Sequence, residues 1–337
     1  MNKRERMFRA LKREEIDRPP VFCANSTATY QQAETLQIKR PLFHQKSKEM
    51  ARMAEGAYEI LDFDAVRLPF CQTMEAEALG CEVSYRDFFP SNNIPIYSLD
   101  STPKFPEDFL KRGRIPELID AFKLLKRNME GKVMVIGGVT GPLTIARALL
   151  DSVPLLKASI KNPEKIIPFL EVGKRASIEL SMALLEAGAE AIVIEDMIAS
   201  PDLLHPKTYI NILSKYHKQI IQTISAPVIL HVCGNVTLIA EEMQKTGAIA
   251  LSIDPKAETG LMRRNVGEKI LLIGGVETTA LALSNPKEIK VICSKALNDG
   301  IDFLAPGCAI PPISPIENIH AMVESAKMFG KYPLNLS

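Results

Sequence analysis

Eight short apolar runs, most of them separated by stretches of helical periodicity, constrain the fold of this chain most. They occupy residues 21–24, 63–69, 133–136, 191–194, 228–230, 249–253, 270–273 and 301–304. Apolar strands that alternate with helices are typical of parallel β/α units, because a crossover must carry the chain back between parallel strands. The count of eight favours a closed α/β architecture, the (β/α)8 or TIM barrel, over an open sheet.

Helical periodicity fills most of the intervals between these runs. We expect helices at residues 115–129, 143–150, 163–187, 206–223, 236–246 and 286–298, and a first helix over residues 2–15. The interval 71–114 breaks the rhythm, contains several prolines, and predicts an excursion over one end of the barrel. We interpret residues 1–337 as a single (β/α)8 barrel domain, with residues 1–18 as an N-terminal helical extension.

Composition excludes several classes of partner. The net charge is +1, so nothing favours nucleic acid or an anionic membrane surface as a partner. No apolar run approaches the roughly 18 residues of a membrane span, and the charged N-terminus lacks the apolar region of a signal peptide. These features predict a cytoplasmic protein and define no oligomeric state. The six cysteines are then expected to be reduced, which favours metal or catalytic use over disulfides.

Reactive residues gather where the predicted strands end. They are Gly137 and Gly138, Glu195 and Asp196, His231 and Cys233, Asp254, Gly274 and Gly275, and Cys308. The active site of a (β/α)8 barrel lies at the carboxyl ends of its strands. Several such residues at this one edge therefore indicate a functional site.

The stretch PVILHVCGN, residues 227–235, predicts half of a metal site. Its apolar run ends at His231 and Cys233, and residues two apart in a strand point to the same side. Cys308 follows the last predicted strand and can face the same point from across the barrel. Three protein ligands leave one position open, as in catalytic zinc sites. The alternative is two buried cysteines in small turns beside a hydrogen-bonded histidine.

The acidic residues at the strand ends have two interpretations. Asp254 is a candidate fourth ligand in the resting state, while Glu195 and Asp196 are candidate ligands or bases. Each carboxylate is equally explained as a helix N-cap or a solvated turn. The remaining cysteines and most of the remaining histidines are interpreted as structural or surface residues: Cys23, Cys71, Cys81, Cys293, His205, His217 and His320.

Several segments together resemble one family along nearly the whole chain. They are RMFRALKREEIDRPPV, LPFCQTMEAEALGCEV, GGVTGPLTIARALL, IEDMIASPDLL, HVCGN, LLIGGV and APGCAIPPISPIENIHAMV. The chain resembles the uroporphyrinogen decarboxylase superfamily, and within it the methylcobamide:coenzyme M methyltransferase branch of the methanol- and methylamine-specific type. HVCGN and PGCAIPP are the most specific segments, because they hold the metal ligands of that branch.

The resemblance implies a zinc ion (Zn2+) held by His231, Cys233 and Cys308, with Asp254 as a displaceable fourth ligand. The decarboxylases of the superfamily use no metal and carry an arginine-rich loop after the first strand. Here that loop is residues 23–29 and contains no arginine. This departure argues against decarboxylase activity.

The implied reaction is methyl transfer to a thiol. A free thiol with a pKa near 8.5 is a poor nucleophile at neutral pH, whereas a zinc-bound thiol is deprotonated. We expect coenzyme M to attack the methyl group of methylcobalamin or a related methyl–Co(III) corrinoid, yielding a thioether and Co(I). A separate carrier protein is expected to deliver the corrinoid, because no segment of this chain resembles a cobalamin-binding module.

The glycine pairs have a ligand-binding and a structural interpretation. Gly137-Gly138 and Gly274-Gly275 allow a large ligand to approach the backbone closely, and simple turn chemistry explains them equally well. Glu195 is grouped with them as a cofactor-binding candidate.

Three other functions compete with this one. The first is a corrinoid-dependent methyltransferase with another acceptor, and the second is a metal-free uroporphyrinogen decarboxylase. The third is a catalytically silent corrinoid-binding partner, which predicts neither metal nor turnover.

Overall fold

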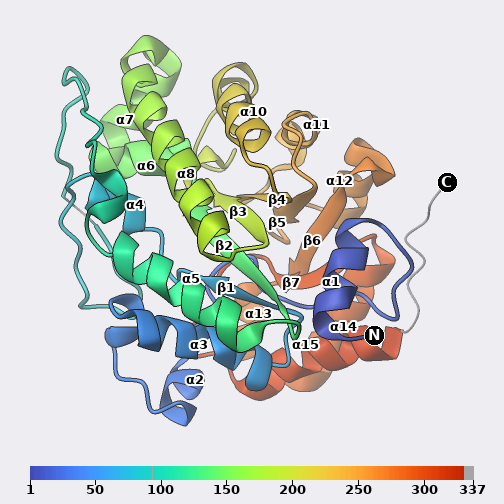
Figure 1. Cartoon of the computed structure of the whole chain (residues 1–337). Helices are drawn as coiled ribbons and strands as arrows, with labels where there is room; N and C mark the ends of the chain where they lie inside the picture. The colour runs from blue at the N-terminus through green and yellow to red at the C-terminus, as the bar shows by residue number, and fades with distance from the viewer. Residues whose placement is uncertain (93, 330–337) are drawn as a thin grey trace.

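Parallel strands in sequential order form the centre of the molecule (Figure 1). The structure, a computed structural model, describes residues 1–92 and 94–329, and within them a seven-stranded sheet. The strands are β1 (Ala65–Leu68), β2 (Met134–Thr140), β3 (Ala191–Glu195), β4 (Val228–Val232), β5 (Ala250–Ile253), β6 (Leu271–Val276) and β7 (Phe303–Pro306). Each strand pairs in parallel with the next along the chain, as the β/α alternation predicts.

The two edges of this sheet meet through the segment around Val21. The Leu304 N–H donates to the Pro20 carbonyl at 3.0 Å, and the Phe22 N–H donates back to the Leu304 carbonyl at 3.3 Å. On the other side, the Asp64 N–H just before β1 donates to the Val21 carbonyl at 2.8 Å. The barrel-type fold is therefore confirmed, with a single bridge in the eighth position.

The prediction of a regular strand over residues 21–24 is wrong. Only Val21 forms a bridge, with Leu304 of β7. Pro19 and Pro20 precede it and have no N–H group to donate to a neighbouring strand. Donation from this side therefore cannot continue toward the N-terminus. Toward the C-terminus the chain bends at Ala24 and Asn25, which ends the pairing although the run is as apolar as the others.

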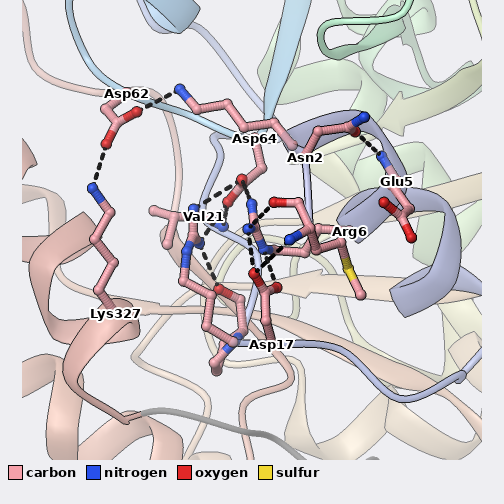
Figure 2. A network of polar contacts seen from close by, with 12 residues as sticks. Asn2, Glu5, Arg6, Asp17, Val21, Asp62, Asp64 and Lys327 are labelled. Carbon is pink, nitrogen blue, oxygen red and sulfur yellow. Dashed lines mark hydrogen bonds and ion pairs between the residues drawn. The ribbon is translucent and has the colours of Figure 1, made fainter.

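A buried ion network fixes residues 19–29, the segment that closes the barrel and is called the closing segment below (Figure 2). The Asp64 carboxylate is 0% exposed and accepts hydrogen bonds from Arg6 at 2.6 Å, from Arg18 at 2.8 Å and from the Val21 N–H at 2.8 Å. Arg6 also binds Asp17 at 2.7 Å. A buried carboxylate is costly unless it is paired and hydrogen-bonded. Asp64 therefore holds the first helix and the closing segment against β1.

Helices surround the sheet (Figure 1). They are α1 (Lys3–Leu11), α2 (Tyr30–Thr35), α3 (Ser47–Glu59), α4 (Met74–Ala78), α5 (Ile115–Met129), α6 (Pro142–Leu149), α7 (Ser152–Lys161), α8 (Ile167–Ala187), α9 (Pro206–Thr208), α10 (Ser214–Thr223), α11 (Ala240–Gln244), α12 (Thr259–Val266), α13 (Thr278–Leu283), α14 (Pro286–Asn298) and α15 (Ile316–Phe329). The first helix ends at Leu11, earlier than expected, and Arg13 beyond it has a φ of +61°. The helix expected over 206–223 contains a π-helical turn, Tyr209–Leu213.

Side-chain alternation along the strands separates two apolar cores. Ala191 and Val193 of β3 belong to a cluster inside the barrel, whereas Ile192 and Ile194 belong to the outer cluster with the helices. Met7 of α1 also belongs to the inner cluster. A period of two gives each strand one inward and one outward set of side chains. The inward set therefore continues, at the carboxyl ends of the strands, into the residues described below.

The excursion after β1 contains α4, the 3-10 turn Phe109–Lys111, and an antiparallel bridge between Ser84 and Ser91. Part of this segment, residues 71–73 and 89–92, lines a cavity. Across the described residues, no helix combines the length and the apolar character needed to cross a membrane.

Candidate active site and metal centre

The inward side chains change from apolar to polar at the carboxyl ends of the strands. Ala65, Ala191, Ile229 and Ala250 are inner-core residues. Counting along each strand in steps of two leads from them to Arg67, Glu195, His231 and Ser252, all buried. Glu195 is the register partner of His231, and His231 is the register partner of Ser252. Glu195, His231 and Ser252 therefore lie at one level at one end of the barrel, and the Arg67 side chain contacts Glu195 there.

His231, Cys233 and Cys308 meet at this level, as the sequence predicts. His231 Nε2 lies 3.2 Å from Cys233 Sγ, and Cys233 Sγ lies 3.7 Å from Cys308 Sγ. The three candidate ligand atoms all lie within 4.8 Å of one another. Two sulfurs bound about 2.3 Å from one tetrahedral zinc ion are about 3.8 Å apart. The spacing and the nitrogen–sulfur donor set therefore fit zinc.

Ser252 determines which nitrogen of His231 faces the cysteines. His231 Nδ1 lies 3.1 Å from the Ser252 carbonyl oxygen and 3.0 Å from Ser252 Oγ. A carbonyl oxygen only accepts, so Nδ1 carries the proton and donates it. Nε2 is then unprotonated and presents its lone pair to the sulfurs, which is the tautomer that a metal ligand requires.

The two cysteines of the cluster have unequal acidity. The hydrogen bond from Cys233 outweighs burial and lowers the pKa of Cys308 to about 4. The same hydrogen bond, together with burial, raises the pKa of Cys233. Cys308 is the thiolate of the pair, and thiolates are the form in which cysteine binds metals.

Asp254 follows β5, but its carboxylate is not part of the cluster. Asp254 Oδ2 accepts from the Gly234 N–H at 3.3 Å, and Oδ1 accepts from the Lys256 N–H at 3.0 Å. Within residues 1–92 and 94–329, the candidate metal group contains only His231, Cys233 and Cys308. Gly234 directly follows Cys233, so Asp254 lies close to the cluster. Its role as a displaceable ligand stays a prediction.

A cavity of about 430 Å³ opens beside Cys308. Phe89, Pro90 and Asn92 of the excursion line it, together with residues of α6 and of the loops after β3 and β7. Its arginine and carboxylate lining residues are Arg67, Arg147 and Glu195. The volume lies at the small end of the range for small-molecule sites, roughly 300–1,000 Å³.

Arg67 and Glu195 form a buried ion pair at this cavity. The two side chains are in direct contact and only 2% and 3% exposed. Glu195 Oε2 also accepts from Asn25 Nδ2 at 3.1 Å and from Gln72 Nε2 at 2.5 Å. Burial lowers the pKa of Arg67 to about 10, so the guanidinium stays charged at neutral pH. Glu195 therefore neutralises Arg67 and orients two amide side chains.

The predicted glycines make room mainly for the protein itself. A side chain at Gly138 would overlap the Arg67 guanidinium, so this glycine lets the ion pair form. A side chain at Gly137 would meet Ile192, one at Gly274 the Ile253 carbonyl, and one at Gly275 Ala296. Contact of these glycines with a ligand stays a prediction.

Asp196 has the structural role that the sequence left open. It accepts from the Thr144 N–H at 2.7 Å, in the first turn of α6, and binds His217 Nε2 at 2.9 Å. His217 Nδ1 in turn lies 3.1 Å from the Tyr209 hydroxyl. All three side chains are completely buried. Asp196 thus caps α6 and ties it to α10.

Sequence reasoning missed three residues at the cavity: Arg67, Cys71 and Arg147. Arg67 left a signal, because it is a charged residue within the apolar run AVRLP and lies two residues after Ala65, so that both side chains point into the barrel. Cys71 was interpreted as structural, yet Arg114 lies 3.6 Å and Thr73 3.3 Å from its sulfur. Arg147 lies on a helix and left no signal.

The fold is a β/α barrel whose strands follow one another in sequence order. A cluster of one nitrogen and two sulfur ligands lies beside a cavity at the carboxyl ends of these strands. Together these features define a class of barrel protein suited to binding a thiophilic metal. Its sequence matches the family described as Uroporphyrinogen decarboxylase (URO-D) over residues 2–329. The chain belongs to the uroporphyrinogen decarboxylase family, which confirms the resemblance seen in the sequence.

Several similar proteins within this family are methyltransferases by name. The chain is 33% identical over 326 residues to the methylcobamide:CoM methyltransferase MtaA of Methanosarcina barkeri, covering 94% of this chain and 95% of that protein. It is 29% identical over 334 residues to the methylcobamide:CoM methyltransferase MtbA of Methanosarcina acetivorans, covering 97% and 98%. A solved structure of a methyltransferase from Methanosarcina mazei has a TM-score of 0.92 and 32% identity, covering 98% and 99%.

Proposed function

We propose that this protein transfers a methyl group from a methylated corrinoid, presented by a carrier protein, to the thiol of coenzyme M. His231, Cys233 and Cys308 would hold a zinc ion, with Asp254 as a displaceable ligand. The observation that carries the proposal is the convergence of these three ligand atoms within 4.8 Å, beside a cavity that Cys308 lines. The names of the similar proteins support the donor and the acceptor.

The bound metal would supply Lewis-acid chemistry, lowering the pKa of the substrate thiol so that the thiolate is present at neutral pH. In the overall reaction the thiol loses its proton and its sulfur forms a bond to the methyl carbon. The cobalt–carbon bond breaks and its electron pair stays on cobalt, which becomes Co(I). Ser252 keeps the His231 proton on Nδ1 throughout, leaving Nε2 free.

The size of the cavity supports different places for the two substrates. About 430 Å³ accommodates a small thiol but cannot enclose a corrin ring, which is larger than the ligands of ordinary small-molecule pockets. The ring must therefore lie over the mouth and direct only its methyl group inward. Leu203, Leu238 and Ile313, which follow β3, β4 and β7, are 54%, 73% and 62% exposed. These apolar side chains are candidates for contact with the carrier.

The closing segment argues against decarboxylase activity. Asn25 and Ser26 line the cavity, whereas the family resemblance implies arginines in this loop of a decarboxylase. Asn25 instead binds Glu195. The segment thus offers the cavity neutral side chains and no cluster of cations for substrate carboxylates.

Metal content and turnover test the proposal directly. We expect about one zinc per chain, and formation of Co(I) from free methylcobalamin only when coenzyme M is present. Cys308→Ala should lose zinc and turnover together. Cys293→Ala is the matched control, because Cys293 is a buried cysteine of α14. Zinc-free wild-type protein after anaerobic purification with added zinc, or unchanged turnover in Cys308→Ala, would refute the proposal.

Proton release provides a second test. Binding of coenzyme M to the zinc-loaded protein should release about one proton per thiol, because metal-bound thiols are deprotonated. Calorimetric titrations in two buffers of different ionisation enthalpy measure this number. Identical binding enthalpies in both buffers would contradict deprotonation of the substrate.

A further inference from the structure

Two guanidinium groups line the cavity, and they differ in their partners. Arg67 is neutralised by Glu195. Arg147, near the end of α6, donates from Nε to Ser152 Oγ at 3.2 Å and from Nη1 to the Asn92 carbonyl at 3.3 Å. Both acceptors are uncharged. Within the part of the chain that the structure describes, no ion pair involves Arg147, so its charge is uncompensated beside the cavity.

The charges of the cavity wall favour an anionic ligand. The charges of Arg67 and Glu195 cancel each other, and the Cys71 thiolate faces Arg114, whose Nη1 lies 3.6 Å from its sulfur. The Cys308 thiolate belongs to the cluster, where the metal would balance it. Among the described residues of the wall, Arg147 is therefore the charge without a charged partner. A charge in a partly buried cavity is stabilised by an opposite charge much more than it would be in water. A ligand with a single negative charge would therefore balance Arg147.

The surroundings of Arg147 hold its guanidinium in place before any ligand arrives. The backbone carbonyl of Asn92 accepts from Arg147, and the Asn92 side chain donates from Nδ2 to the Ala148 backbone carbonyl at 3.0 Å. Ser152, at the start of α7, binds Nε. Asn92 belongs to the excursion, so that segment clamps the arginine against α6. A fixed, planar guanidinium suits an oxyanion, which it binds with paired hydrogen bonds.

We propose that Arg147 binds the anionic group of the thiol substrate. The inference rests on the proposed function for the sulfur end of that substrate, which faces the cluster of Cys308. The chemical class is a short thiol that carries a terminal oxyanion, such as the sulfonate of coenzyme M. Arg147 thereby selects this thiol over neutral thiols of similar length.

Kinetics with two thiols test the proposal on the zinc-loaded full chain. Methyl transfer from free methylcobalamin is measured with 2-mercaptoethanesulfonate and with neutral 2-mercaptoethanol, for the wild type, Arg147→Gln and Arg147→Lys. Loss of a charged hydrogen bond predicts that Arg147→Gln raises KM for the sulfonate at least about tenfold with little change in kcat. KM for mercaptoethanol should stay the same in all three proteins. KM of Arg147→Lys for the sulfonate should lie between the values of the wild type and Arg147→Gln.

The control is Arg127→Gln, which removes one exposed positive charge from α5. It should leave both thiols unaffected. Preference for the sulfonate that survives in Arg147→Gln would overturn the proposal. An equal rise of KM for both thiols in Arg147→Gln would also overturn it, because Arg147 would then only hold the segment around Asn92 against α6.

A binding measurement separates this proposal from the proposed function. Ethanesulfonate has the anion but no thiol, so calorimetry with it tests Arg147 independently of methyl transfer. Binding to the wild type that weakens at least about tenfold in Arg147→Gln supports the anion site even if no thiol is methylated. Equal binding, or no binding to either protein, contradicts the anion site even if methyl transfer occurs.

Discussion

His231 and Ser252 are register partners on β4 and β5, and His231 Nδ1 lies 3.1 Å from the Ser252 carbonyl oxygen. The backbone itself therefore sets the tautomer of the candidate ligand. The Ser252 hydroxyl, 3.0 Å away, is a second partner of the same nitrogen. Because strand pairing holds the carbonyl in place, the orientation of His231 depends on the fold more than on one side chain.

Ser252→Ala should weaken zinc binding only modestly. Removing an outer partner of a ligating histidine typically costs about 10–100-fold in metal affinity, but here the carbonyl acceptor remains. We expect a loss at or below about tenfold, measured by competition with a chelator. A loss as complete as that of His231→Ala would show that the hydroxyl, and not the backbone, orients the ring.

Glu195→Gln should destabilise the fold strongly. It leaves the Arg67 guanidinium buried without a counter-charge, which typically costs about 3–5 kcal/mol. Urea unfolding measures the effect. Glu179→Gln is the matched control, because Glu179 forms an exposed pair with Arg175, and such a pair contributes at most about 1 kcal/mol. Equal midpoints for Glu195→Gln and the wild type would contradict a stabilising role for the pair.

Asp196→Asn should lower stability without changing metal content. The variant weakens the cap of α6 and loses the charged partner of His217. Hydrogen bonds to charged groups contribute about 1.5–3 kcal/mol each. Unfolding free energy and zinc per chain are measured on the same preparation. A variant that unfolds normally but loses zinc would return Asp196 to the list of candidate ligands.

Cys71 should react as a thiolate at neutral pH. Burial raises its pKa, but the charge of Arg114 and the hydrogen bond from Thr73 outweigh burial and lower the pKa from 9.0 to about 5. Iodoacetamide labelling, followed by peptide mass spectrometry, should therefore change little between pH 6.5 and 8.5. An ordinary thiol gains roughly fiftyfold over this interval. That steep dependence at Cys71 would contradict the lowered pKa.

The same lowered pKa makes stability depend on pH. A group whose pKa is lower in the folded state adds stability above its unfolded pKa, here 9.0, and the gain disappears as the pH falls through about 5. Cys71→Ser should therefore flatten the rise of unfolding free energy between pH 5 and 9. An unchanged slope would show that other groups cause the rise.

Local pattern in the sequence was sufficient for much of this molecule. Apolar runs alternating with helical stretches predicted the barrel, because strand and helix periodicity depend on neighbouring residues alone. The same period of two put His231 and Cys233 on one side of a strand end. The motif Pro306-Gly307-Cys308 after the last predicted strand indicated Cys308 as the third ligand. The prediction of a closing strand over residues 21–24 failed because Pro19 and Pro20 lack N–H groups on one side of Val21 and the chain bends at Ala24 and Asn25 on the other.

What only the tertiary structure decided is which distant side chains meet. Closure of the barrel brings Arg67 of β1 to Glu195 of β3, and the excursion brings Asn92 to Arg147. The packing of the loops after β4 and β5 also directs the Asp254 carboxylate to backbone N–H groups near the cluster. Sequence alone determined seven of the eight expected strands, most of the expected helices and the three candidate ligands. The cavity and its charges depend on long-range packing, which no local pattern encodes.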